Sequence, residues 1–219
     1  MIKLSVNMIT QNGETLIKKA LLSVLPYCNE AIVCDTGSTD RTVEILKDLQ
    51  KQYPHLQYRV QNTQDPAALI VILNDLKHRS SFPWILRIDD DEVFPKETME
   101  EVQNIKEDVV SYSFPFLHYE DEHFINPAAH SPQRPGFFVV RLFKNVREIN
   151  WVNNFGREVL AYNRLRISSR ARQVAYCRKL RNPFLHLGEL RQGKRKHEYT
   201  FHQRGHCALP LGKYEEYIR

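Results

Sequence analysis

Residues 30–53, EAIVCDTGSTDRTVEILKDLQKQY, predict a buried strand, a turn and an amphipathic helix in close succession. The first six residues form a largely apolar run that ends in Asp35. The turn TGSTD consists mostly of residue types that cap helices, and apolar residues then recur at helical spacing from Val43 to Leu49. This stretch therefore predicts one strand-and-helix unit of an α/β protein.

The alternation of strand and helix continues on both sides of this unit. The predicted strands are 2–9, 30–35, 56–60 and 84–88, and the predicted helices are 13–28, 41–53, 66–79 and 96–105. Such repetition predicts a mostly parallel central sheet with helices on both faces. The longer strand-like runs 109–119 and 136–143 then predict an antiparallel extension toward the C-terminus.

The composition favours a single soluble domain. The chain has 219 residues, of which 42% are hydrophobic, and it lacks an apolar run long enough to cross a membrane. Lys3 and Asn7 interrupt what would be the apolar region of a signal peptide. The four cysteines have no metal-ligand spacing, which suits reduced thiols. We therefore expect a cytoplasmic protein without a transmembrane segment, and peripheral membrane association stays open.

The last third of the chain is strongly basic. Between Arg157 and His206 there are thirteen Lys or Arg residues and three Asp or Glu residues. Such a stretch can bind nucleic acid, an anionic membrane surface or a phosphorylated small molecule, and a solvated charged face is an equally good interpretation. Because few aromatic residues are available there for base stacking, we expect no nucleic acid partner.

Four consecutive carboxylates, Asp89 to Glu92, follow the apolar strand 84–88. Carboxylates this close repel each other by roughly 1 kcal/mol even in water, so the cluster predicts a bound cation. In an extended chain Asp89 and Asp91 point to one side and Asp90 to the other. Carboxylate oxygens suit Mg²⁺ or Mn²⁺. The alternative interpretation is an acidic cap on the helix that follows.

Polar residues stand at the ends of three predicted strands. Thr10 to Asn12 follow the first strand, Asp35 to Ser38 follow the second, and the acidic cluster follows the fourth. Open α/β sheets bind their ligands outside the carboxyl ends of the strands. The three strand ends therefore predict a binding site at one edge of the sheet.

Three segments, SVNMITQNGETL, EAIVCDTGSTDRTVEIL and WILRIDDDEVFP, resemble the family 2 glycosyltransferases of GT-A fold in their order and spacing. The resemblance is clear from Leu4 to Pro95 and looser through RLFKN, INWVNNFGREVL and FLHLG. It implies a Rossmann-like GT-A domain over residues 1–219. Residues 1–95 would bind the nucleotide-sugar and metal, and residues 96–219 would form the acceptor side and basic tail. The possibility that the chain is the first domain of a longer protein stays open.

The resemblance implies an enzyme that transfers a sugar, with inversion, from a nucleotide diphosphate donor to a hydroxyl of a glycan or other acceptor. The expected donor is a UDP-sugar and the expected cofactor is Mn²⁺ or Mg²⁺. The resemblance assigns Asp91 and His186 to the metal, with His118, His123 and His130 as rivals to the latter. The residues assigned to the donor are Ile9, Thr10, Asn12, Asp35, Arg87, Asp89 and Asp90.

Within this set the roles differ. The resemblance implies that Asp35 hydrogen-bonds the base, that Asp89 lies on the ribose side, and that the backbone of Ile9 and Thr10 lines the nucleoside pocket. Arg87 lies in an otherwise apolar strand, where an unpaired charge is costly to bury. We therefore expect its side chain to reach a carboxylate or a phosphate.

Inverting transfer needs a group that removes the proton of the acceptor hydroxyl, and we assign this role to Glu158. Similar proteins tend to carry His-Glu or an acidic pair here, whereas NNFGREVL has no His before Glu158. A surface ion pair with Arg157 is the alternative. The aperiodic segment 120–136 predicts a loop that shapes the acceptor site, and its acidic residues are the next candidates for the base: Glu120, Asp121 and Glu122.

Two other functions stay open at this point. A nucleotidyltransferase uses a similar sheet and acidic metal site, but a loop rich in glycine and basic residues would favour it, and TQNGETL has one glycine and no basic residue. A non-catalytic module that binds a nucleotide or a glycan is the alternative from another class.

Overall fold

The computed structural model describes residues 1–63, 65–118, 138–154, 157–163, 165–166 and 177–188. The first half alternates strands and helices: β1 (Leu4–Thr10), α1 (Ile17–Val24), a 3₁₀ turn (Leu25–Tyr27), β2 (Glu30–Asp35), α2 (Thr42–Gln52), β3 (Leu56–Val60), α3 (Pro66–Arg79), β4 (Trp84–Asp89), β5 (Glu92–Val93) and α4 (Lys96–Gln103). All four predicted strands and all four predicted helices are confirmed, with small shifts at their ends.

The second half is built from strands. They are β6 (Ser111–His118), β7 (Phe138–Lys144), β8 (Ile149–Asn154), β9 (Arg157–Tyr162), β10 (Leu165–Arg166), β11 (Cys177–Lys179) and β12 (Phe184–His186). The central sheet has the order β3-β2-β1-β4-β7-β6-β12-β5, and β11 pairs with β6. Strands β1 to β4 are mutually parallel, whereas β7 is antiparallel to both β4 and β6. The predicted parallel sheet with an antiparallel extension is therefore confirmed.

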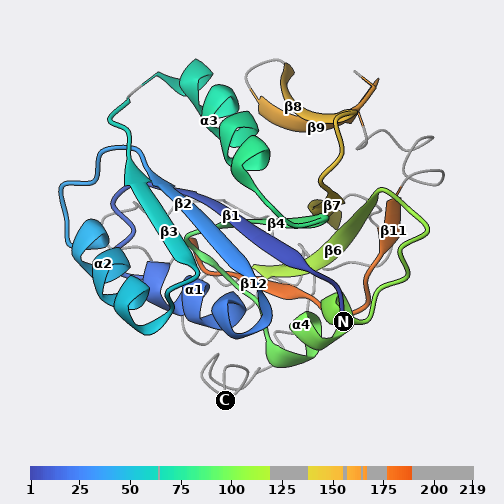
Figure 1. Cartoon of the computed structure of the whole chain (residues 1–219), viewed down its shortest axis with the longest axis horizontal. Coiled ribbons are helices and arrows are strands. Elements are labelled where there is room, and N and C mark those ends of the chain that lie inside the picture. Colours follow the sequence, from blue (N-terminus) through green and yellow to red (C-terminus); the bar gives the residue numbers. More distant parts are fainter. Residues whose placement is uncertain (64, 119–137, 155–156, 164, 167–176, 189–219) are drawn as a thin grey trace, which may run out of the picture.

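Helices cover both faces of the central sheet, as predicted (Figure 1). Strand β2 shows how alternate side chains divide between the two faces. Ala31 and Val33 pack into the larger core beneath α1 and α2, whereas Ile32 and Cys34 pack with Ile72 of α3. Because both faces are covered, every residue of β2 is buried. This burial explains why the sequence of β2 is a nearly continuous apolar run.

A second, three-stranded sheet with the order β10-β9-β8 lies on the same side of the molecule as α3 (Figure 1). Asn74 of α3 joins the two units, because its side chain donates to the Trp151 carbonyl at 2.9 Å and accepts from the Trp151 amide at 2.9 Å. The Trp151 ring packs edge-on against Phe143 of β7. The small sheet, which carries Glu158, is thus anchored to α3 and to the antiparallel extension.

Several predictions fall on residues that the structure does not describe, namely the loop at 120–136, with two of the rival histidines, and most of the basic tail. Among the described helices, none is both long and apolar enough to span a bilayer. The three cysteines within the described residues, Cys28, Cys34 and Cys177, carry free thiols, as expected.

Candidate functional site

The loops that follow β1 and β2 are joined by backbone and side-chain hydrogen bonds. The Thr36 amide donates to the Thr10 carbonyl at 2.9 Å. Asn12, which has a positive φ of 53°, donates its amide to Ser38 Oγ at 2.8 Å and accepts from the Thr39 amide at 2.8 Å. These contacts hold two of the three predicted strand ends together as one surface. Asn12 therefore lies at the predicted edge, where it links the two loops.

Asp35 ends β2 and is fully buried. One carboxylate oxygen accepts from the amides of Gly37 at 3.0 Å and Ser38 at 2.9 Å, and the other accepts from Ser38 Oγ. The residue thus fixes the turn that follows the strand. Its contact with a nucleobase stays a prediction, because in this structure both carboxylate oxygens bond to the turn.

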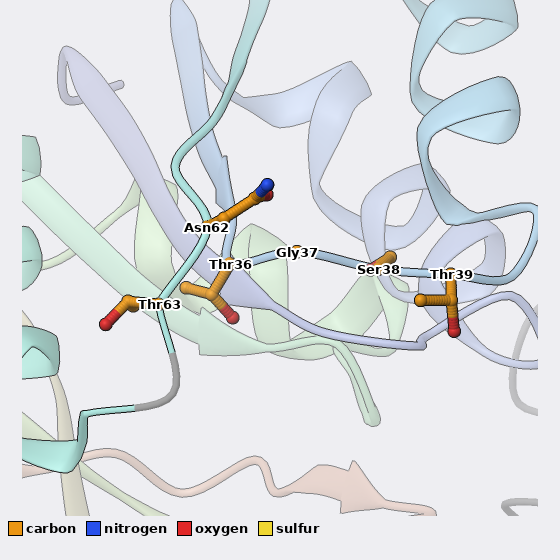
Figure 2. A pocket seen from close by; sticks show the side chains of 6 residues that line it. All are labelled: Thr36, Gly37, Ser38, Thr39, Asn62 and Thr63. Atoms are coloured by element: carbon orange, nitrogen blue, oxygen red, sulfur yellow. The ribbon is translucent and has the colours of Figure 1, made fainter.

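A pocket of about 430 Å³ lies directly above that turn, between the ends of β2 and β3. Figure 2 shows that its walls come from two segments, and the lining residues are Thr36, Gly37, Ser38, Thr39, Asn62 and Thr63. None of the six residues is charged, and every one except the glycine offers a hydroxyl or amide group. Gly37 has a φ of +108°, and a Cβ there would lie 3.2 Å from Asn62 Oδ1. The glycine therefore keeps this part of the pocket open.

Asp89, at the end of β4, is bound by two arginines. Its Oδ2 lies 2.7 Å from Arg87 Nη1 on the same strand and 2.7 Å from Arg141 Nη2 on β7. Burial by itself raises the pKa of Asp89, but the guanidinium groups of Arg87 and Arg141 overcome this effect and hold it well below its usual range. Asp89 is thus firmly ionised. The expectation that Arg87 reaches a carboxylate is confirmed.

The next residues of the acidic cluster turn in different directions. The Asp90 carboxylate accepts from Thr10 Oγ1 at 2.5 Å and lies so near Gly13 that a Cβ there would come within 2.6 Å of it. The Glu92 carboxylate accepts from the Asp89 amide at 3.1 Å and pairs with Arg141. Burial raises the pKa of Glu92, and the pairing with Arg141 opposes this shift. Asp90 thus fastens the cluster to the loop after β1.

Asp91 and His186, the two residues assigned to the metal, lie side by side. His186 Nε2 is 3.9 Å from Asp91 Oδ1, and the Leu187 amide donates to the Asp91 carbonyl at 2.8 Å. A Cβ on Gly188 would lie 2.9 Å from His186 Cε1 and 3.0 Å from Asp91 Oδ2. A glycine at 188 therefore leaves both side chains room. Asp91 is nearly buried, whereas His186 is partly exposed.

The charge and the donor types at this strand end suit a divalent cation. Residues 89–92 bring four carboxylates, and Arg87 and Arg141 bring two guanidinium groups, so the cluster has a formal charge of −2. One imidazole and one carboxylate, as in His186 and Asp91, are donors that Mn²⁺ accepts. Within the described residues no group of three or more His, Cys, Asp or Glu side chains is placed to hold a metal. The residues present therefore fit an ion that takes further ligands from substrate or water.

Glu158 lies apart from this cluster, on β9 of the small sheet, where it pairs in register with Asn153. Its side chain is exposed. No hydrogen bond or ion pair of Glu158 is found among the described residues. The structure thus exposes the side chain of the predicted base on a strand whose Leu160 and Ala161 are buried, and the role of Glu158 stays a prediction.

Four residues of this region were not predicted from the sequence. Arg141 is a lone charge in the apolar run GFFVVRLF, and the argument that singled out Arg87 applies to it equally. Glu92 belongs to the acidic cluster but was not given a role. Asn62 and Thr63 follow β3, whose end was not considered, although the sequence QNTQD there is polar.

Residues 5–168 match the model of the family described as Glycosyl transferase family 2. Uncharacterized glycosyltransferases of Rickettsia bellii and Rickettsia conorii are 36% and 35% identical over 106 residues, which is 47% of this chain and 32% and 34% of theirs. The chain thus spans about a third of the length of these curated relatives.

Among solved structures, the chain is similar to S. aureus TarS 1–349, with 16% identity, a TM-score of 0.49, and coverage of 66% of this chain and 47% of that one. It is also similar to the mannosyltransferase PcManGT from Pyrobaculum calidifontis in complex with GDP-Man and Mn²⁺. There the identity is 17% and the TM-score 0.44, with coverage of 54% and 36%.

Proposed function

The chain belongs to glycosyl transferase family 2, and we propose that it transfers a sugar, with inversion, from a uridine diphosphate donor to a hydroxyl of a glycan or other acceptor. One observation carries the proposal: the uncharged pocket beyond β2 and β3 and the Asp91–His186 pair beyond β4 lie along the same edge of the sheet. Neighbouring strands are about 4.8 Å apart, so roughly 10–14 Å separates the pocket from the end of β4, where the acidic cluster begins. A nucleoside diphosphate can bridge that span with its base at one end and its phosphates at the other.

The pocket is suited to an uncharged base. The hydroxyl groups of Thr36, Ser38 and Thr63 and the amide of Asn62 can donate to base carbonyls and accept from base N–H groups. Asp35 supports this surface from below by holding the turn at Gly37 and Ser38. The proposal keeps Asp35 as the base-binding residue, either directly or through this turn, with Ile9 and Thr10 at the neighbouring strand end.

The diphosphate would lie beside the acidic cluster, where Asp91 and His186 would hold Mn²⁺ or Mg²⁺. When bound, the ion would neutralise the charge of the diphosphate leaving group. Asp90 positions the cluster against the loop after β1 through Thr10. Asp89 is fixed and ionised by its two arginines, and a ribose hydroxyl could donate to its partly exposed carboxylate.

Glu158 is proposed as the general base, with its exposed carboxylate accepting the proton of the acceptor hydroxyl. A general base must be accessible to the acceptor hydroxyl before the acceptor binds, and the exposed side chain of Glu158 meets this condition. The acceptor side of the enzyme would extend over residues 96–219. A soluble cytoplasmic location is part of the same proposal.

Calorimetric titration with UDP, GDP, CDP and dTDP, each with and without Mn²⁺, tests the proposed function. We expect UDP to bind tightest and Mn²⁺ to strengthen that binding. Equal or absent binding of all four nucleotides would contradict the uridine donor. Slow hydrolysis of a UDP-sugar in the presence of Mn²⁺ then separates an enzyme from a non-catalytic binding module. Release of UDP and free sugar, rather than UMP and sugar 1-phosphate, separates attack at the anomeric carbon from the attack at phosphorus that a nucleotidyltransferase makes.

A further inference from the structure

The acidic turn, residues 89–92, is tied together at both ends by one side chain from another strand. Arg141 of β7 uses a single nitrogen, Nη2, to contact Asp89 Oδ2 at 2.7 Å and Glu92 Oε1. The other oxygen of Glu92 accepts from the Asp89 amide at 3.1 Å. Arg141 therefore closes a ring of contacts around the turn that contains Asp91.

The opposite side of the acidic turn is held by β12. The Leu187 amide donates to the Asp91 carbonyl, and His186 pairs in register with Glu92. The turn thus lies between β7 and β12, with its backbone fixed by β12 and its side chains fixed by Arg141.

We propose that Arg141 is a positioning residue, which fixes the acidic turn so that the Asp91 carboxylate faces His186. The further claim that Arg141 governs metal affinity rests on the proposed function, in which Asp91 and His186 hold the ion. Arg141 itself is not assigned a contact with metal or donor. Its effect passes through Asp89 and Glu92.

Stability alone does not account for this arrangement. Arg87 and Arg141 converge on the same oxygen, Asp89 Oδ2, and two like charges brought this close repel. Both side chains are largely buried, and the Nε atom of each finds no acceptor among the described residues. Buried ion pairs cost desolvation that their attraction often fails to repay. Compared with Arg87 alone, Arg141 adds contacts with both ends of the acidic turn, Asp89 and Glu92.

The alternative role, a simple counterion, predicts the opposite effect on metal binding. Removing a positive charge from beside the acidic turn makes the cluster more negative, which strengthens its attraction for a divalent cation. Loss of a positioning residue instead lets the turn move and weakens metal binding, typically by about 10–100-fold for residues that orient metal ligands. The sign of the change therefore separates the two roles.

The first experiment measures Mn²⁺ affinity by electron paramagnetic resonance in wild type and in Arg141→Gln. We expect a loss of about tenfold or more. Arg59→Gln is the matched control, because Arg59 also lies on a strand of the sheet but pairs with Asp75 on α3, away from the acidic turn. Its Mn²⁺ affinity should equal that of wild type. Unchanged or tighter Mn²⁺ binding by Arg141→Gln would overturn the proposal.

A double variant guards against misfolding, because Arg141→Gln alone leaves the buried Glu92 carboxylate without its ionic partner. Glu92→Gln combined with Arg141→Gln removes one charge of each sign, so the formal charge of the cluster is that of wild type. The positioning role predicts that Mn²⁺ affinity stays low in this double variant. Recovery of wild-type affinity would show that charge balance, and not the contacts of Arg141, is what matters.

Amide hydrogen exchange of the metal-free protein tests the positioning role without any metal. Exchange at the Asp89 and Leu187 amides should be faster in Arg141→Gln than in Arg59→Gln, since both amides donate to residues of the acidic turn. Equal rates would overturn the proposal. If wild type binds no Mn²⁺, the proposed metal site fails, and the exchange rates still decide whether Arg141 positions the turn.

Discussion

His186 Nε2 lies 3.9 Å from Asp91 Oδ1, although Asp91 follows β4 and His186 ends β12 near the end of the described chain. The two residues meet because the short strand β5, directly after the acidic turn, pairs antiparallel with β12. This proximity is the structural basis of the proposed metal site.

Asp91→Asn and His186→Gln should each weaken Mn²⁺-dependent binding of UDP by about tenfold or more, because each removes one of two protein ligands. Binding of UDP without metal should be unchanged. Calorimetry measures both quantities. Asp48→Asn is the control, since Asp48 is an exposed carboxylate on α2 that pairs with Lys51. Metal dependence that persists in both site variants would show that these ligands are misassigned.

Glu158→Gln should lower turnover by about 10²–10⁴-fold while donor and metal binding are retained, because the amide cannot take the acceptor proton. Steady-state transfer assays together with UDP titration measure the two effects. Glu148→Gln serves as the control, because Glu148 is exposed just before β8 on the same part of the molecule. Transfer near the wild-type rate in Glu158→Gln would make Glu158 structural and turn attention to the acidic residues of 120–122.

Gly37→Ala should destabilise the protein by more than about 1 kcal/mol, because the backbone there has a φ of +108° that side chains other than glycine rarely adopt. It should also weaken UDP binding, since the new Cβ would press on Asn62 across the pocket. Denaturant unfolding and UDP titration measure these effects. Normal UDP affinity in a folded Gly37→Ala protein would show that the uracil base binds elsewhere.

Asp40 should contribute stability that depends on pH. Its carboxylate accepts from the amides of Thr42 at 3.0 Å and Glu14 at 3.1 Å. Although burial raises its pKa, these hydrogen bonds and that from Thr42 Oγ1 lower it overall. The folded pKa thus lies below the unfolded one, so the contribution is present above the unfolded value near 3.9 and is lost as the pH falls through the folded value.

Asp40→Ala should therefore lower the free energy of unfolding by about 0.5–1.5 kcal/mol at pH 7, the usual net contribution of a hydrogen bond, because the amides of Thr42 and Glu14 lose their acceptor. The difference from wild type should shrink below pH 4. Urea unfolding at pH 7 and pH 3 measures it. A difference that is the same at both pH values would rule out the ionised carboxylate as its source.

The strand ends could be predicted from the sequence because parallel strands align their carboxyl ends at one edge of the sheet. Period-two alternation also anticipated that Asp90 would differ from its neighbours, and its carboxylate accepts from Thr10 Oγ1 and lies close to Gly13. The alternation gave no guide to Asp91, because the extended strand ends at Asp89 and a turn follows.

Contacts that depend on strand order were beyond sequence reasoning. Arg141 reaches the acidic turn only because β7 inserts beside β4, and no local pattern indicates which strand becomes that neighbour. Trp151 lies on the strand β8, which directly precedes the strand that carries Glu158. That the strand would leave the central sheet and pair in a separate one was not predicted, since period-two patterns do not distinguish the two sheets.

The most direct test of the central claim is electron spin-echo envelope modulation of Mn²⁺ bound to the protein with UDP. If Asp91 and His186 hold the ion, the spectrum of wild type should show modulation from an imidazole ¹⁴N nucleus. That modulation should disappear in His186→Gln and persist in the control Asp48→Asn. A wild-type spectrum without nitrogen modulation, or one that is unchanged in His186→Gln, would contradict the proposed metal site.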